Sequence, residues 1–391
     1  MQTSWIDHPS GYLALSDRNS FFVGDARSLW PDGSPESSPT SSPTSLAVPT
    51  AFTDDDGFIA YRRHGRHLFV FGGVHAPPTR REALLDAFLD SAQAQRLSVV
   101  VVQLRASQID LFARRGFTVN RFGTSFGLRL DSFRLSGTRR MKLRNKIGRA
   151  RRLGLRVCEV GRELPRSPQT FAALDAISGH WLRRKGKKEL DFMIGELGPP
   201  EDPRRRIFVV LGPPAGERSR STEDASEQDE PLINQHINHN KNPINSSASV
   251  NTELHDTWLG FITYVPVFGT CPGYLHDLTR RLPVAPPGAM ELCNAEAMAR
   301  LHGEGAAFLH FGFTPFVVDS EDPLPPSVPS SPWLSRAVRL LYRHGRLIYP
   351  AQSQAEYKRK WGPDLIEPEY VAARPLSLRA IWDLLRVTRS L

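Results

Sequence analysis

The residues of this sequence best suited to chemistry are Asp277 and Arg280, which lie three positions apart just after a predicted strand. A carboxylate can bind an ammonium group or act as a general base, and a guanidinium can contact a phosphate or a developing oxyanion. The same two residues also suit an ordinary ion pair on the surface. Their types and spacing therefore make them candidates for a site, to be weighed with the elements around them.

A third acidic candidate is Glu291, which opens a predicted helix directly after Pro286, Pro287 and Gly288. A carboxylate in the first turn commonly does no more than stabilise the helix dipole. Gly312 lies at the end of the strand that follows this helix, and a glycine there permits a close approach of the backbone by a ligand or by a neighbouring segment.

Two groups of cations suit phosphate contact. Lys358 and Lys360 flank Arg359 and precede Trp361, which favours phosphate binding with stacking of a base, although a solvated face with the tryptophan in the core explains the pattern equally well. The second group is a predicted basic helix over 136–156.

In the basic helix, Leu143, Ile147 and Ala150 can face the protein while cations cover the remaining surface. Gly154 is a natural helix stop. The helix either contacts the phosphates of tRNA or lipid, with Arg144 as the first candidate ligand, or simply joins two lobes through solvent.

These residues are positioned by a pattern that occurs twice. A strand near residue 67 is followed by Ala76-Pro77-Pro78, a helical stretch and a strand from Ser98, and a strand near residue 274 is followed by Ala285-Pro286-Pro287, a helical stretch and a strand near Phe308. The repeat predicts an α/β fold of two tandem lobes, each a mixed sheet flanked by helices.

Two Ser-, Pro- or Asn-rich segments interrupt this pattern and are predicted to be disordered insertions within hairpins. His236 and His239 lie in the second one, where a solvated polar tract is favoured over a metal site. The C-terminal segment is an amphipathic helix that either docks on the body or lies on an anionic membrane. The predicted divisions are an N-terminal lobe 1–135 with insertion 31–55, the basic helix 136–156, a catalytic lobe 157–375 with insertion 213–256, and the C-terminal helix 376–391.

Composition narrows the class of protein. The 391 residues carry a net charge of +9 and are 40% hydrophobic, which excludes a wholly disordered chain and favours an anionic partner. No secretory signal or membrane-spanning run is seen, and the three cysteines are best explained as buried free thiols, so we expect a soluble cytoplasmic protein.

Five motifs in order resemble the C-terminal catalytic domain of the bacterial phosphatidylglycerol lysyltransferases, the multiple peptide resistance factor (DUF2156) family, in a standalone form without the flippase region. The resemblance covers about residues 10–390 apart from the insertions. Departures from the family pattern are Pro287 in place of an asparagine and Thr314 in place of an alanine. The motifs are LSGTRRMKLRNKIGRARRLGL (135–155), SGHWLRRKGKKELDFMIG (178–195), HDLTR with PPGAME (276–280 and 286–291), FGFTPF (311–316) and YKRKWGPDLIEPEYVA (357–372).

The resemblance implies two GNAT-like (acetyltransferase-like) lobes and transfer of an aminoacyl group from aminoacyl-tRNA to a hydroxyl of a membrane lipid such as phosphatidylglycerol. It implies no cofactor beyond the aminoacyl-tRNA co-substrate, and peripheral contact with the inner face of the membrane follows if the acceptor is a lipid. The implied residues are Asp277, Arg280 and Glu291 for catalysis and Arg144, Lys358, Lys360, Gly288 and Gly312 for substrate binding.

Three alternatives stay open at this point. The acceptor could be a soluble small molecule or a sterol. The chain could be an acyl-CoA N-acyltransferase, although the strand–helix joins carry Ala-Pro-Pro where that chemistry needs a glycine-rich pyrophosphate loop. The chain could also be a noncatalytic basic module that binds RNA or membrane. The sequence shows no metal constellation, nucleophile elbow or P-loop.

Overall fold

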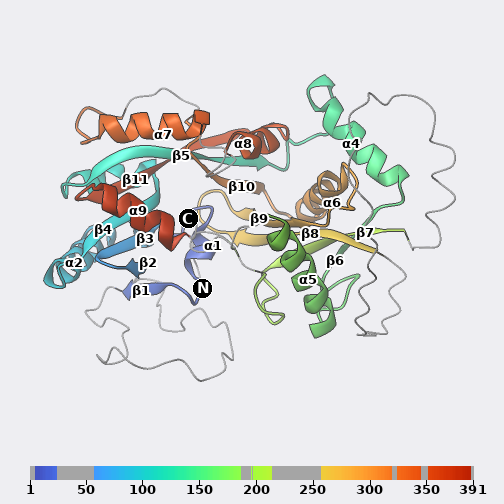
Figure 1. The fold of residues 1–391 in the computed structure, drawn as a ribbon, viewed down its shortest axis with the longest axis horizontal. Coiled ribbons are helices and arrows are strands. Elements are labelled where there is room, and N and C mark those ends of the chain that lie inside the picture. The colour runs from blue at the N-terminus through green and yellow to red at the C-terminus, as the bar shows by residue number, and fades with distance from the viewer. Residues whose placement is uncertain are drawn as a thin grey trace, which may run out of the picture.

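The computed structural model describes residues 5–23, 57–185, 195, 197–213, 257–318, 324–344 and 351–388. Its strands form one sheet in the order β1-β2-β3-β4-β11-β5-β10-β9-β8-β7-β6, which runs through both halves of the molecule (Figure 1). The strands are β1 (Ser20–Val23), β2 (Phe58–His64), β3 (His67–Phe71), β4 (Ser98–Arg105), β5 (Thr118–Arg129), β6 (Arg156–Glu159), β7 (Arg206–Gly212), β8 (Thr257–Val267), β9 (Gly273–Arg281), β10 (Phe308–Pro315) and β11 (Leu365–Arg374).

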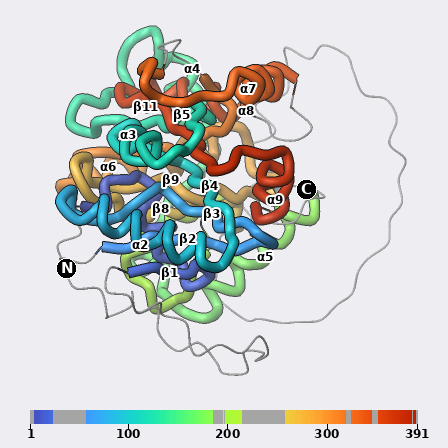
Figure 2. Tube along the Cα trace, turned by 90° about the vertical axis from the view of Figure 1, so that its left-hand side faces the viewer, coloured from blue at the N-terminus to red at the C-terminus, as the bar shows by residue number. Residues whose placement is uncertain are grey.

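Helices cover both faces of this sheet. In the first half, α2 packs on one face and α7 and α9 pack on the other. In the second half, α5 and α6 lie on opposite sides of the strands (Figure 2). The helices are α1 (Gly11–Ala14), α2 (Arg81–Ala94), α3 (Ile109–Ala113), α4 (Met141–Arg152), α5 (Pro168–Lys185), α6 (Ala289–Gly303), α7 (Pro332–His344), α8 (Ala351–Arg359) and α9 (Leu378–Val387).

The predicted α/β class is confirmed, and the repeat appears as two strand–helix–strand units. In β3-α2-β4 and in β9-α6-β10 the two strands are parallel neighbours, as expected when a helix makes the crossover. The two units share one sheet because β5 of the first half pairs antiparallel with β10 of the second, with Thr124 opposite Thr314.

One strand lies where the sequence did not place it. β11 falls inside the predicted lobe 157–375, yet it lies between β4 and β5 of the first half, with Tyr370 opposite Leu104 and Ile366 opposite Phe126. The predicted lobe boundaries stay a prediction. Apart from Pro213, the two predicted insertions, with His236 and His239, lie outside the described residues.

The predicted basic helix forms α4, and its packing fixes the start of α6. Leu143, Ile147 and Ala150 are buried, and Gly154 follows the helix at φ +72°. Gly288 precedes α6 at φ +96°, and a Cβ at this position would overlap the carbonyl oxygen of Lys146. Only glycine allows this backbone conformation together with this contact.

The C-terminal helix α9 docks on the body of the protein. The Ser377 side chain accepts a hydrogen bond from the Ala380 N–H at its start, which is a typical N-cap. Leu384 is buried, and Asp383 lies 2.8 Å from His67 Nδ1 on β3. None of the helices in the described ranges is long and apolar enough to span a membrane.

We predict that Gly288→Ala lowers the free energy of unfolding by roughly 1–3 kcal/mol, because the new methyl group meets α4 and alanine disfavours positive φ. Urea denaturation measures this. Gly303→Ala is the matched control in the same helix, since a Cβ there meets no atom within 4 Å, and it should be neutral or slightly stabilising. Equal stability of the two variants would contradict the proposed contact between α4 and α6.

Candidate functional site

A β-bulge in β9 determines which predicted residues share a face of the sheet. Ile262 of β8 lies opposite Thr279 and Tyr264 lies opposite His276, so β9 holds one more residue than β8 between these pairs. In a regular strand, residues three apart face opposite sides. The bulge brings His276 and Thr279 onto one face, where His276 Nε2 lies 2.7 Å from Thr279 Oγ1.

Asp277 and Arg280 lie within β9 rather than after a strand, and Asp277 belongs to a buried ion pair. Its Oδ2 lies 2.7 Å from Arg205 Nη1, and its Oδ1 accepts a hydrogen bond of 3.0 Å from the Gly195 N–H. The two side chains are 4% and 6% exposed, so the pair is not on the surface. Burial raises the pKa of Asp277, and the charge of Arg205 partly opposes this rise.

Arg280 is buried on the same side of β9 as Asp277. Its guanidinium carbon lies 4.2 Å from the ring centroid of Trp181 in α5, which is a close cation–π contact. The charge of Arg280 also lowers the pKa of Asp277, so the two groups act on one another. The Trp181 ring thus packs against Arg280 and supports its guanidinium.

Glu291 lies on the other side of the sheet, in the first turn of α6. Its Oε1 is 2.8 Å from Lys360 Nζ and 3.4 Å from Lys146 Nζ of α4. Burial alone would raise the pKa of Glu291, but the hydrogen bond and charge of Lys360 outweigh it and lower the pKa. Lys360 Nζ also lies 3.9 Å from the ring centroid of Tyr357. The carboxylate therefore holds two lysines together beyond any contribution to the helix dipole.

Lys358 is buried, unlike the neighbouring Lys360. Its Nζ donates hydrogen bonds of 2.9 Å to the carbonyl oxygens of Gly312 and Phe313 in β10. Burial lowers the pKa of Lys358 to about 7, against the opposing charge of Glu369. Trp361 has 0% exposure, so the core placement is the one that forms. Gly312 adopts φ +69° at an irregularity of the β10–β5 ladder, which lets its carbonyl face Lys358.

A polar group centred on Asn294 of α6 was not predicted from the sequence. The Asn294 Oδ1 accepts a hydrogen bond of 2.6 Å from Tyr264 and lies 3.1 Å from His276 Nδ1. Burial lowers the pKa of His276 to about 4, with the charges of Lys358 and Lys360 adding to the effect. The imidazole is therefore neutral at physiological pH. The network assigns its proton to Nδ1, which leaves Nε2 to accept from the Thr279 hydroxyl.

The predicted residues thus form two groups that flank one irregular point of the sheet. The parallel ladder between β9 and β10 ends at Leu275 and His310. Beyond these residues, β9 stays paired only with β8, and β10 only with β5. Asp277 and Arg280 lie on the α5 side of this point. The α6 side holds Glu291, Lys360, His276, Lys358 and the Gly312 carbonyl.

Two predicted residues lie apart from both groups. Gly288 is covered by α4, as described above. Arg144 is exposed on α4, and its Nη1 donates hydrogen bonds of 2.8 Å to the carbonyl oxygens of Leu135 and Gly137. In this structure, Arg144 therefore fastens the segment that leads into the basic helix.

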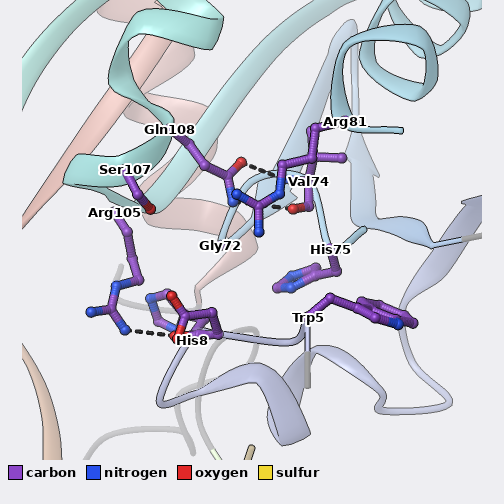
Figure 3. A pocket seen from close by; sticks show the side chains of 10 residues that line it. Trp5, His8, Gly72, Val74, His75, Arg81, Arg105, Ser107 and Gln108 are labelled. Carbon is purple, nitrogen blue, oxygen red and sulfur yellow. Dashed lines mark hydrogen bonds between the residues drawn. The ribbon is translucent and has the colours of Figure 1, made fainter. Parts of the chain in front are cut away.

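The first half contains a small pocket at the corresponding position after β3, but no predicted site residue lines it (Figure 3). Gln108 binds both the N–H and the carbonyl of Val74 there, at 2.9 and 3.1 Å. Burial lowers the pKa of His75 in this pocket to about 4. The Gln108 amide and the buried His75 thus hold the chain that follows β3 in place.

We predict that Lys358→Met changes how stability depends on pH. The folded-state pKa near 7 lies below the ordinary value of 10.5, so between these values the unfolded chain binds a proton that the folded chain does not. Stability contributed by this site therefore rises with pH through that window, by at most about 1.4 kcal/mol per pH unit. Urea denaturation at pH 7, 8 and 9 should show a flatter rise for the variant, and parallel curves would contradict the low pKa.

A double-mutant cycle tests the buried ion pair. Arg205→Met should cost about 3–5 kcal/mol, because it leaves the Asp277 carboxylate buried without its main partner, and adding Asp277→Leu should restore part of the loss. Arg114→Met is the surface control, since Arg114 and its partner Glu82 are 64% and 60% exposed, and it should cost about 1 kcal/mol or less. Additive effects of the two changes at Arg205 and Asp277 would show that they are not coupled.

The chain resembles the same group of proteins in its sequence and in its fold. Residues 48–217 and 236–373 match the family described as "Phosphatidylglycerol lysyltransferase, C-terminal". The chain is 29% identical over 142 residues to the phosphatidylglycerol lysyltransferase of Staphylococcus xylosus. It is 32% identical over 162 residues to the lysylphosphatidylglycerol biosynthesis bifunctional protein LysX of Mycobacterium sp. (strain JLS). The aligned segments cover 36% and 41% of this chain but only 16% and 14% of those relatives.

Two solved structures share the fold. L-PGS from Bacillus licheniformis superposes with a TM-score of 0.66 at 17% identity, covering 97% of this chain and 91% of that one. The C-terminal domain of a putative lysylphosphatidylglycerol synthetase from Agrobacterium fabrum gives 0.59 at 19% identity, covering 84% of each chain. Since the family match extends over both halves of the sheet, the chain belongs to the phosphatidylglycerol lysyltransferase C-terminal family.

Proposed function

We propose that this protein transfers an aminoacyl group from aminoacyl-tRNA to a hydroxyl of a membrane lipid such as phosphatidylglycerol. The observation that carries the proposal is the family match over both halves of the sheet. The charged groups that flank the end of the β9–β10 ladder supply side chains suited to such a reaction. The names of the family and of the relatives make lysine the first amino acid to test.

The proposed reaction exchanges one ester for another. The acceptor hydroxyl oxygen attacks the carbonyl carbon of the aminoacyl ester, the bond from that carbon to the ribose oxygen breaks, and the proton of the hydroxyl ends on the ribose oxygen. The reaction needs a partner for the ammonium group, stabilisation of negative charge on the carbonyl oxygen, and a route for the proton.

The α5 side of β9 suits the polar ends of the donor. Asp277 would bind the ammonium of the aminoacyl group, with Arg205 holding the carboxylate in place. Arg280, oriented by Trp181, would meet the developing oxyanion or the terminal phosphate of the tRNA. In a buried setting each of these charge contacts is stronger than it would be in water.

On the α6 side, the paired Glu291 and Lys360 can exchange protons or hold a phosphate with the neighbouring Lys146. The arginines of α4 face solvent next to this group and fit the phosphate backbone of tRNA. His276 is neutral and held by hydrogen bonds on both ring nitrogens, so we assign it to positioning rather than to proton transfer.

The acyl-CoA alternative is less well supported. Acyl-CoA enzymes of the acetyltransferase plan place pyrophosphate on backbone N–H groups at a helix N-terminus. Here the N-terminus of α6 is covered by α4, whose Lys146 carbonyl oxygen abuts Gly288. A carbonyl oxygen at this place repels a phosphate. Transfer to a soluble acceptor and simple binding of RNA or membrane are outcomes of the experiment below.

The test is a transfer assay with labelled lysyl-tRNA and phosphatidylglycerol vesicles, followed by extraction into organic solvent. Label should enter the lipid phase and should be lost after RNase pretreatment. Asp277→Asn and Arg280→Lys should each lower the rate about 100-fold or more when assayed at a temperature at which circular dichroism shows both variants folded. Arg281→Gln, an exposed neighbour on the same strand, is the matched control and should retain the rate.

Three other results would each change the proposed function. Label lost from tRNA into a small aqueous product would replace the lipid by a soluble acceptor. Full activity of Asp277→Asn would remove that carboxylate from the mechanism. Tight binding of tRNA or vesicles without loss of label beyond spontaneous hydrolysis would refute the enzymatic proposal.

A further inference from the structure

Two helices of the first half expose large apolar side chains without burying them anywhere in the described structure. Trp333 and Leu340 on α7 are 42% and 61% exposed, and Leu378 and Trp382 on α9 are 74% and 51% exposed. Of the eight large apolar side chains exposed in the described part of the chain, these are four, and they include both tryptophans. Large apolar side chains exposed on helices that cover the same face of the sheet indicate a contact surface.

The inner faces of both helices are already satisfied. Leu334 and Val338 of α7 and Ala380 and Leu384 of α9 belong to the same buried cluster, on the face of the sheet opposite α2. Both helices belong to the half of the molecule that contains β1 to β4 (Figure 1). Packing against the core therefore fixes which side of each helix faces inward. Trp333 and Trp382 lie on the sides that face away from the core.

Cations alternate with these apolar side chains. Arg336, Arg339 and Arg343 are exposed on α7, and that helix contains no Asp or Glu. Arg386 of α9 is exposed as well, and its guanidinium carbon lies 5.7 Å from the ring centroid of Trp382.

α9 carries a further exposed arginine, Arg379, and one acid, Asp383. Asp383 is turned inward, 2.8 Å from His67 and 4.0 Å from Arg379. In the described residues, neither helix exposes an acid, and each presents one tryptophan, one leucine and two or three arginines.

We propose that the outward sides of α7 and α9, called here the α7–α9 surface, dock on an anionic phospholipid bilayer. Tryptophan favours the boundary between lipid headgroups and acyl chains, leucine favours the acyl side, and arginine pairs with lipid phosphates. The charge of the surface complements anionic lipid and no other part of the described chain combines exposed tryptophan with exposed arginine in this way. The inference extends the proposed function, since a lipid acceptor must be reached at the bilayer surface, but its test does not depend on turnover.

The basic helix α4 provides a matched comparison. It also exposes two apolar side chains, Met141 at 48% and Leu153 just beyond its end at 39%, among several arginines. It has no tryptophan. If charge with any exposed apolar group were enough for lipid binding, α4 would bind vesicles as well as the α7–α9 surface does.

The test is flotation of the full chain with vesicles of phosphatidylglycerol and phosphatidylethanolamine, compared with vesicles of phosphatidylcholine alone. The wild type should bind the anionic vesicles and be released by high salt. Changing Arg336, Arg339 and Arg343 together to Gln should weaken binding on the order of 100-fold. Changing Trp333 and Trp382 together to Ala should also weaken it, on the order of tenfold or more. A control variant changes α4 and the residue after it instead, with Met141→Ser, Leu153→Ser, Arg149→Gln and Arg152→Gln together. This variant should bind vesicles like the wild type.

Tryptophan fluorescence gives an independent readout. Vesicle binding should shift the emission of the wild type to shorter wavelength and expose it to quenching by brominated lipid, and both effects should largely vanish when Trp333 and Trp382 are changed to Phe. Retention of vesicle binding by the α7 and α9 variants, or its loss in the α4 variant, would overturn the proposal. So would a concentration-dependent dimer that buries the two tryptophans and binds no vesicles.

A soluble acceptor separates this inference from the proposed function. Short-chain phosphatidylglycerol below its micelle concentration needs no bilayer. Variants of the α7–α9 surface should use it at the wild-type rate while losing transfer to vesicles. Transfer by the wild type without any vesicle binding would refute the docking surface and leave the proposed transferase function intact. Vesicle binding without transfer would refute the transferase function and leave the docking surface intact.

Discussion

The extra residue in β9 decides how the charged side chains of the second half are distributed. Without it, His276 and Thr279 would face opposite sides of the sheet, and their hydrogen bond of 2.7 Å would be impossible. The bulge begins after His276, one residue beyond Leu275, where the ladder to β10 ends, so the polar segment of β9 is paired only with β8. This single irregularity determines which side of the sheet each group occupies. Asp277 and Arg280 lie on one side, and the group around Asn294 lies on the other.

Several elements were predictable because local pattern determines them. The repeated strand–helix–strand order, the basic helix with Leu143, Ile147 and Ala150 inward, and the helix begun by Glu291 all follow from periodicity and turn residues. The pairing partners were not predictable in this way. Arg205 meets Asp277 across 72 positions of sequence, and no local signal marks that contact. The bulge was missed for the same reason, because only the register of β8 against β9 defines it.

The lysines show how environment separates residues that look alike in sequence. Lys358 and Lys360 were grouped as one cationic cluster, since both are hydrophilic and two apart. Helix α8 ends between them, at Arg359, and they point to different partners: the Lys358 ammonium to two carbonyl oxygens of β10, the Lys360 ammonium to Glu291. Trp361 then fills the core beside them. Which lysine is buried depends on where β10 lies, and that is a property of the tertiary fold.

The placement of β11 has a consequence for the order in which the chain can fold during its synthesis. β11 separates β4 from β5, so the edge of each strand that faces β11 stays unpaired until residues 365–374 have left the ribosome. A nascent first half therefore presents two unpaired strand edges while more than two hundred further residues are made, the condition under which strands from different chains associate. Insertion of β11 between β4 and β5 makes the described strands one continuous sheet only after the strands of both halves have been synthesised.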